Sequence, residues 1–241
     1  LNNGTDGTSS IVQNLAEGES VSDSFTVRVT DDQGGYADQL VTVTITGSND
    51  RPVISFTVGN TAGSVTEDGT QTASGTLTST DIDKNATATW SIAGNGSTGN
   101  YGSLALDGNS GKWTYTLNNG TDGTSSIVQN LAEGESVSDS FTVRVTDDQG
   151  GYADQLVTVT ITGSNDRPVI SFTVGNTAGS VTEDGTQTAS GTLTSTDIDN
   201  GATATWSIQG SNTGTYGSIA LDGNSGKWTY TLANGTNGTS S

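Results

Sequence analysis

Cysteine, histidine and methionine are all absent from the sequence of 241 residues. Without cysteine there is no disulfide, and without histidine or cysteine there is no Ser-His-Asp triad, no Cys-His pair and no zinc site of the usual kind. A chain without cysteine needs no oxidising compartment. Together with its many Thr, Ser, Gly and Asn residues, this composition favours an extracellular protein over a cysteine-poor cytosolic one.

Basic residues are scarce as well. Lys and Arg number 7 against 26 Asp and Glu, so the formal net charge is −19. Nucleic acids and anionic membrane surfaces would repel such a chain, and we expect neither as a partner. No apolar run reaches the roughly 18 residues of a membrane-spanning helix, and no signal peptide begins at Leu1. We therefore expect no membrane insertion.

The residues that are present form a tandem repeat. Residues 1–50 recur unchanged at 117–166, and residues 51–83 recur at 167–199. Such arrays extend, space or display something, whereas a catalytic centre is normally made once. A two-carboxylate hydrolase is the enzyme class that remains, but the same carboxylates recur in each repeat. We expect a non-enzymatic protein.

Apolar and polar residues alternate along several short segments, which predicts half-buried strands and argues against disorder. The clearest are KWTYTL at 112–117, SFTVRVT at 140–146 and VTVTITG at 157–163, and further strands are predicted at 54–58, 75–79, 88–92 and 102–106. About seven short strands in each repeat indicate an all-β fold of antiparallel β-sandwiches in a tandem, linear array. Trp90 and Trp113 lie in alternating strands and are expected in the core.

The only two prolines, Pro52 and Pro168, both stand in GSNDRP, directly after an alternating strand. Because proline ends a strand ladder, we predict the closing half of a repeat at 1–50, a complete repeat at 51–166 and the opening part of the next at 167–241. A frame with units at 1–116 and 117–231 fits the length equally well. Since Leu1 falls inside a repeat, we expect the sequence to be a window onto a longer protein.

Carboxylates gather in loops that suit calcium, which takes six to eight oxygen ligands. The candidate groups are Glu67 and Asp68 in TEDGT, Asp81 and Asp83 in TDIDKN, Asp147 and Asp148 in TDDQGG, and Asn165 and Asp166 in the linker. Asp81 and Asp83 would share one face of an extended strand and could bind one ion. The alternative is plain turn chemistry. We favour that alternative for Asp107 and Asn109 in DGNSG.

The order of these motifs resembles that of VCBS-type repeats. The closing half is LAEGESVSDSFTVRVTDDQGGYADQLVTVTITGSNDRP at 131–168, and the opening half is GSVTEDGTQTASGTLTSTDID at 63–83. This resemblance implies Ig-like or cadherin-like modules of giant RTX-type adhesins on the bacterial cell surface, often exported by type I secretion and involved in attachment or biofilm formation. The sequence departs from such proteins in lacking a GGxGxD array, so it is not their calcium β-roll.

The resemblance also implies Ca²⁺ ions between neighbouring repeats, as at cadherin junctions. For the first junction, the implied ligands are Asn49, Asp50, Glu67, Asp81 and Asp83. For the second junction, they are Asn165, Asp166, Glu183, Asp197 and Asp199.

Two other functions stay open, a carbohydrate-binding or surface-layer module and a subunit of a self-assembling extracellular filament. The expected partners are the neighbouring repeats of the same chain. Residues 1–50 contain the FTVRV and VTVTITG strands that residues 167–241 lack. Exposed strand edges invite pairing, so head-to-tail self-association between chains is a further hypothesis.

Overall fold

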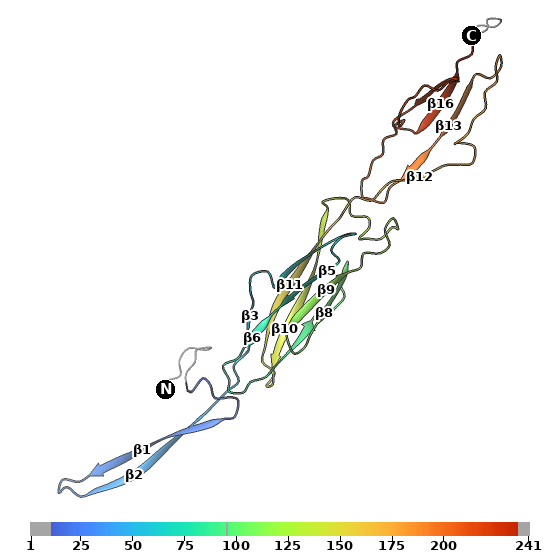
Figure 1. Cartoon of the computed structure of the whole chain (residues 1–241). Coiled ribbons are helices and arrows are strands. Elements are labelled where there is room, and N and C mark those ends of the chain that lie inside the picture. Colours follow the sequence, from blue (N-terminus) through green and yellow to red (C-terminus); the bar gives the residue numbers. More distant parts are fainter. Residues whose placement is uncertain (1–10, 95, 236–241) are drawn as a thin grey trace. The chain divides into compact units, whose positions relative to one another are not determined.

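The computed structural model describes residues 11–94 and 96–235, and every regular element within these ranges is a β-strand (Figure 1). The chain forms two compact units. Unit 1 consists of Leu1–Asn118 and Val137–Ile161, and unit 2 consists of Asn119–Ser136 and Thr162–Ser241. The all-β fold with sandwich domains in tandem is confirmed. Among the described residues, no helix has the length and apolarity needed to cross a membrane.

A complete β-sandwich occupies most of unit 1. Its strands are β3 (Val53–Ser55), β4 (Ala62–Thr66), β5 (Thr72–Thr76), β6 (Thr78–Thr80), β7 (Ala88–Ala93), β8 (Gly102–Leu106), β9 (Lys112–Leu117), β10 (Ser136–Asp147) and β11 (Tyr152–Thr162). They form a sheet of order β4-β11-β10-β7, a sheet of order β5-β9-β8 and the pair β3-β6. The pairs β7-β10, β5-β9, β8-β9 and β3-β6 are antiparallel.

The alternating strands supply the core of this sandwich. Trp113 and Tyr115 of β9 are fully buried, as are Val143 of β10 and Val159 of β11. Every second residue of a strand points to the same face of the sheet, so these side chains lie in the interior while the residues between them face outward. Trp90 is also buried, at 8 % exposure. The prediction that Trp90 and Trp113 belong to the core is confirmed.

Unit 1 also contains a hairpin made of β1 (Ser20–Thr30) and β2 (Tyr36–Thr46), which pair with each other and with no other strand of the described residues. Asp31 closes its turn, because the Asp31 carboxylate accepts hydrogen bonds from the N–H groups of Gln33 and Gly35. The sequence of this hairpin is identical to that of β10 and β11. Nevertheless, almost all its residues are exposed, whereas the inward-facing residues of β10 and β11 are buried.

Unit 2 repeats the first strands of the sandwich. They are β12 (Val169–Ser171), β13 (Thr188–Thr192), β14 (Thr194–Thr196), β15 (Gly217–Leu221) and β16 (Lys227–Leu232). The sheet β13-β16-β15 and the pair β12-β14 have the same connectivity as their counterparts in unit 1. Gly191 faces Trp228 across β13 and β16, as Gly75 faces Trp113 across β5 and β9. Among the described residues of unit 2, no strands correspond to β10 and β11.

Candidate metal centre

The linker before the complete repeat is tied to the loop that follows β6. The N–H group of Asp50 donates a hydrogen bond of 2.9 Å to the Oδ2 atom of Asp83. In turn, the N–H group of Asp83 donates one of 2.9 Å to the Oδ1 atom of Asp81. The strand ends at Thr80, so Asp81 and Asp83 lie in a loop and their carboxylates are held by backbone contacts. The structure thus brings together three of the residues predicted for the first junction.

The same arrangement recurs in unit 2, where the linker meets the loop after β14. The N–H group of Asp166 lies 3.0 Å from the Oδ2 atom of Asp199. The N–H group of Asp199 lies 3.0 Å from the Oδ1 atom of Asp197. The neighbouring Asn165 is exposed and donates its side-chain amide to the carbonyl oxygen of Asp166. Identical linker and loop sequences therefore fold into matching contacts in both units.

In both copies, carboxylate oxygens are buried without a hydrogen-bond donor. Asp83 is 7 % exposed and Asp199 is 9 % exposed, and the Oδ1 atom of each has no hydrogen-bond partner. The Oδ2 atom of Asp81 is in the same state. Burying a carboxylate oxygen without a partner is costly, and buried charges are normally paired with a cation or coordinate a metal. These oxygens are of the type that a hard divalent cation such as Ca²⁺ prefers.

Two more predicted ligands, Asp147 and Asp148, lie close enough to act on Asp83. Burial raises the pKa of Asp83, the hydrogen bond from Asp50 opposes this, and the negative charges of Asp81, Asp147 and Asp148 raise it further. Asp147 is itself buried, at 7 % exposure. The loop after β6 and the turn between β10 and β11 therefore form one acidic group, and a cation would relieve its repulsion.

The hydrogen bonds of this turn fix Asp147 and Asp148. The side-chain amide of Asn49 donates to the Oδ2 atom of Asp147 at 3.1 Å. The Oδ1 atom of Asp147 accepts the N–H groups of Gln149 and Gly151. The N–H group of Thr87 donates to Asp148, and this contact lowers the pKa of the Asp148 carboxyl. Asn49 and Asp50 thus reach two different acidic loops of the same repeat.

A second contact at each linker does not involve this acidic group. The N–H group of Lys84 donates to the carbonyl oxygen of Asn14 at 3.1 Å, and that of Asn200 donates to the carbonyl oxygen of Asn130 at 2.9 Å. The Lys84 ammonium also lies 3.7 Å from the carboxylate of Glu19. In unit 2 the side-chain amide of Asn200 donates to Glu135 at 3.0 Å. The Lys-to-Asn difference between the copies therefore preserves the contact, although it removes a charge.

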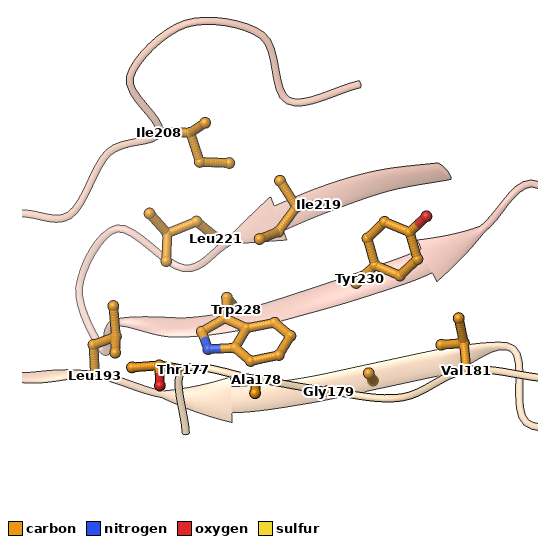
Figure 2. Close-up of a pocket in the computed structure, with 11 residues that line it drawn as sticks. Thr177, Ala178, Gly179, Val181, Leu193, Ile208, Ile219, Leu221, Trp228 and Tyr230 are labelled. Carbon is orange, nitrogen blue, oxygen red and sulfur yellow. The ribbon is translucent and has the colours of Figure 1, made fainter. Parts of the chain in front are cut away.

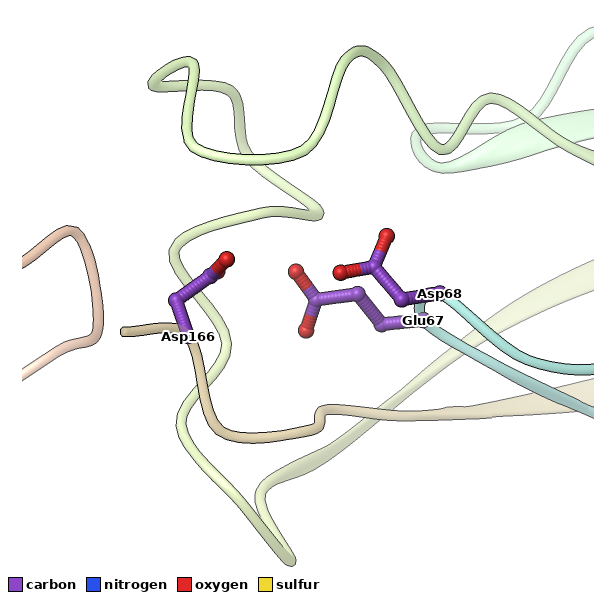
Figure 3. Close-up of side chains that lie close together, drawn as sticks. All are labelled: Glu67, Asp68 and Asp166. Atoms are coloured by element: carbon purple, nitrogen blue, oxygen red, sulfur yellow. The ribbon is translucent and has the colours of Figure 1, made fainter.

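The remaining predicted ligands follow β4 or its counterpart. Figure 3 draws Glu67 and Asp68, consecutive residues in the turn after β4, together with Asp166 of unit 2. Glu67 is 1 % exposed, Asp166 is 4 % exposed and Asp68 is exposed. Glu67 is not among the carboxylates whose charge acts on Asp83. Glu183, its counterpart in unit 2, is exposed. The junction to which Glu67 and Glu183 belong stays a prediction.

Asp107 differs from the candidate ligands. Its Oδ1 atom accepts the N–H groups of Asn109 and Ser110, each at 2.9 Å. These backbone contacts hold the pKa of Asp107 below its ordinary value. The arrangement is that of a carboxylate which closes a turn.

The comparisons with known proteins agree with this fold. Residues 49–163 match the family model of the bacterial cadherin-like domain, and residues 165–241 match that of the bacterial Ig domain. No curated protein matches the chain.

Solved structures of cadherin repeats are similar to the chain. Mouse Cadherin-23 EC22-24 has 20 % sequence identity and a TM-score of 0.46, over 87 % of this chain and 63 % of that chain. Protocadherin Gamma B7 extracellular cadherin domains 1-4 has 19 % identity and a TM-score of 0.46, over 89 % and 49 %. The Protocadherin GammaB4 extracellular domain has 19 % identity and a TM-score of 0.44, over 89 % and 33 %. This chain spans less than two thirds of each. The chain therefore has a fold of Ig-like and cadherin-like β-sandwich domains in tandem, and its residues 49–163 and 165–241 are similar to the two family models.

Proposed function

We propose that the chain is a spacer segment of a secreted bacterial adhesin, in which calcium stiffens the junctions between repeats. The observation that carries this proposal is the linker arrangement found once in each unit. In both copies, a linker N–H group binds one oxygen of an aspartate whose other oxygen is buried without a donor. A buried carboxylate oxygen without a donor is of the kind that coordinates a hard cation, and the repeated sequence forms it in both units.

The residues present are oxygen donors that suit a hard cation such as calcium. Every candidate ligand is a carboxylate, a side-chain amide or a backbone group, and the chain has no histidine or cysteine to select zinc, copper or iron. At the first junction, Asp81, Asp83, Asp147 and Asp148 would hold the ion. A bound Ca²⁺ supplies positive charge that turns the repulsion among these carboxylates into attraction.

Hydrogen bonds between the linker and the acidic group would transmit the effect of a bound ion to the linker. Asn49 and Asp50 belong to the linker, and each donates a hydrogen bond to a carboxylate of the acidic group. If Asp83 and Asp147 were held as ligands, these two hydrogen bonds would hold the linker as well. In unit 2 one such hydrogen bond is present, from the N–H group of Asp166 to Asp199. Glu67 remains a candidate ligand of the first junction, and Asn165, Asp197 and Glu183 remain candidate ligands of the second.

The biological setting is part of the proposal. The bacterial cadherin-like and bacterial Ig domains that match the sequence are typically non-catalytic structural modules, which supports a non-enzymatic role in attachment or biofilm formation. A carbohydrate-binding module has less support. Sugar sites present exposed aromatic rings, and the two tryptophans of the complete repeat that could have served as such rings, Trp90 and Trp113, are buried.

Small-angle X-ray scattering of the 241-residue chain tests the stiffening. We expect the maximum dimension to grow, or its distribution to narrow, when calcium replaces EDTA. The Asp83→Asn and Asp199→Asn double variant should lose this response, and the matched control with Asp107→Asn and Asp222→Asn should keep it. Superimposable wild-type curves in calcium and EDTA would show that calcium does not stiffen the chain.

A further inference from the structure

Six Asn-X-Thr or Asn-X-Ser triplets occur in the sequence, and such triplets are the acceptors of N-linked sugars. They begin at Asn3, Asn85, Asn95, Asn119, Asn234 and Asn237. Two of them, Asn85–Thr87 and Asn119–Thr121, lie wholly within the described residues. A triplet can be modified only where an enzyme reaches its side-chain amide, so the surroundings of these two asparagines distinguish them.

Asn85 is exposed in a tight turn between β6 and β7. The N–H group of Ala86 donates to the carbonyl oxygen of Asp83 at 3.2 Å and closes this turn. Asn85 has a φ of 61°, a left-handed conformation that asparagine adopts more readily than most residues. Among the described residues, no hydrogen bond involves the Asn85 side chain. Thr87, the third member of the triplet, is exposed as well.

Asn119 has the opposite surroundings. It follows β9, is only 8 % exposed and takes part in interactions of its own. Thr121 is exposed, so an enzyme could reach the hydroxyl group of this triplet but not the amide that must react. The same motif is therefore accessible at Asn85 and inaccessible at Asn119.

The second repeat has the same turn without the triplet. Gly201 stands at the position of Asn85 and has a φ of 70°. The N–H group of Ala202 donates to the carbonyl oxygen of Asp199 at 3.1 Å, as in the first copy. The backbone of the turn is thus repeated, and the acceptor residue is not.

The strands that follow this turn are repeated as well. Leu221 pairs with Trp228 across β15 and β16, and both side chains line the pocket drawn in Figure 2. Leu106 pairs with Trp113 in the same register across β8 and β9. Because turn and strands agree, the second repeat is a matched control for the first.

We propose that Asn85 is an acceptor site for an N-linked sugar and that Asn119 is not. The donor is a sugar whose anomeric carbon carries a phosphate leaving group, either a nucleotide-activated hexose or a lipid-linked oligosaccharide. The Nδ2 atom of Asn85 forms a bond to the anomeric carbon, and one amide proton is released. The bond from that carbon to the phosphate oxygen breaks, and its electron pair leaves with the phosphate group.

This proposal shares the extracellular setting of the proposed function, because N-linked sugars stand on surface loops of secreted proteins. The sugar would be attached two residues after Asp83, beside the candidate calcium ligands. Its attachment needs no bound ion, so the calcium proposal and the sugar proposal can each fail while the other holds.

Enzymatic transfer to the folded 241-residue chain tests the proposal, with the modified residues located by peptide mass spectrometry. One arm uses a soluble N-glycosyltransferase with a nucleotide-activated hexose, and the other uses an oligosaccharyltransferase with a lipid-linked oligosaccharide. The arm that modifies Asn85 identifies the donor. In the folded chain, Asn85 should be modified and Asn119 should not. A synthetic peptide of residues 116–124 should be modified at Asn119, because burial and not sequence protects this residue.

Variants separate recognition of the triplet from effects on the turn. Thr87→Ala should abolish modification of Asn85 and Thr87→Ser should keep it, since the motif accepts either hydroxyl group. The Asn200→Lys, Gly201→Asn double variant gives unit 2 the turn sequence of unit 1 and should gain a sugar at position 201. Four results would overturn the proposal: Asn85 unmodified in both arms, Asn119 modified as fast as Asn85 in the folded chain, Thr87→Ala without effect, and position 201 unmodified in the double variant.

Discussion

Replacing Asp81 and Asp83 together with asparagine should change the stability of the complete repeat in opposite directions with and without calcium. Without calcium, the wild type carries buried carboxylate oxygens that lack a donor, close to the charges of Asp147 and Asp148. An unsatisfied buried polar group costs about 1–3 kcal/mol, so the neutral variant should be more stable than the wild type by about 1 kcal/mol in EDTA. Asparagine keeps an oxygen that can accept the N–H group of Asp50.

With calcium, the order should reverse. We expect a dissociation constant on the order of 10⁻⁴ M, in the range of extracellular calcium modules. At a calcium concentration about 100 times higher, binding adds about 2.7 kcal/mol to the stability of the wild type and little to that of the variant. For a domain of this size, that free energy corresponds to roughly 10 °C in melting temperature.

Thermal unfolding followed by circular dichroism, in calcium and in EDTA, measures both differences. The matched control is Asp107→Asn, which keeps an oxygen for the N–H groups of Asn109 and Ser110. Its effect should be small and the same in both buffers. If the Asp81 and Asp83 variant gains as much from calcium as the wild type does, or if the control loses as much as the variant, the assignment of these carboxylates as ligands is wrong.

Three further predictions concern the complete repeat. Burial and the hydrogen bond to Asp139 raise the pKa of Tyr115 above its ordinary 10.0. The folded state therefore holds the hydroxyl proton more tightly than the unfolded state does, and urea unfolding should show stability falling as the pH rises above about 10. The Tyr115→Phe variant should show a smaller fall. A Cβ at Gly75 would lie 2.7 Å from the indole of Trp113, so Gly75→Ala should cost about 1–3 kcal/mol in the same assay. Asn85 has a φ of 61°; Asn85→Gly should change stability by less than about 0.5 kcal/mol and Asn85→Val should cost more than about 1 kcal/mol, and equal effects would contradict the strain argument.

The strands with large alternating side chains could be predicted from the sequence. The predicted strands at 102–106 and 112–117 coincide with β8 and β9, the one at 140–146 lies within β10, and the one at 157–163 overlaps β11. β4 (Ala62–Thr66) was not predicted, because Gly63 interrupts its alternation. Position 63 requires a residue as small as glycine because the indole of Trp113 and the side chain of Val159 lie against it. That requirement comes from two distant strands and leaves no local signal.

Burial could not be predicted from local sequence either. β1 and β10 have the same residues, yet Phe25 is 56 % exposed and Phe141 is 3 % exposed. Local sequence and the turn at Asp31 or Asp147 suffice to form the hairpin, but the opposing sheet decides whether its apolar face is covered. The same residues therefore form a strand in both copies, but their apolar side chains are buried only in β10.

The sequence predicted which residues belong to the candidate site but not how they are arranged. The spacing of Asp81 and Asp83 predicted one face of an extended strand, whereas both lie in a loop in which one binds the other's backbone. The contact between Asp50 and Asp83 joins residues 33 positions apart. Such a contact depends on how the sandwich folds back on its linker, and the spacing of carboxylates in the sequence does not specify it.

Isothermal titration calorimetry of the 241-residue chain with calcium tests the central claim most directly. Because the linker arrangement occurs once in each unit, we expect at least two ions to bind, with dissociation constants on the order of 10⁻⁴ M. The Asp83→Asn and Asp199→Asn double variant should lose this binding, while the Asp107→Asn and Asp222→Asn control should retain it. A wild-type chain that binds no calcium at millimolar concentrations, or a double variant that binds it as the wild type does, would contradict the account.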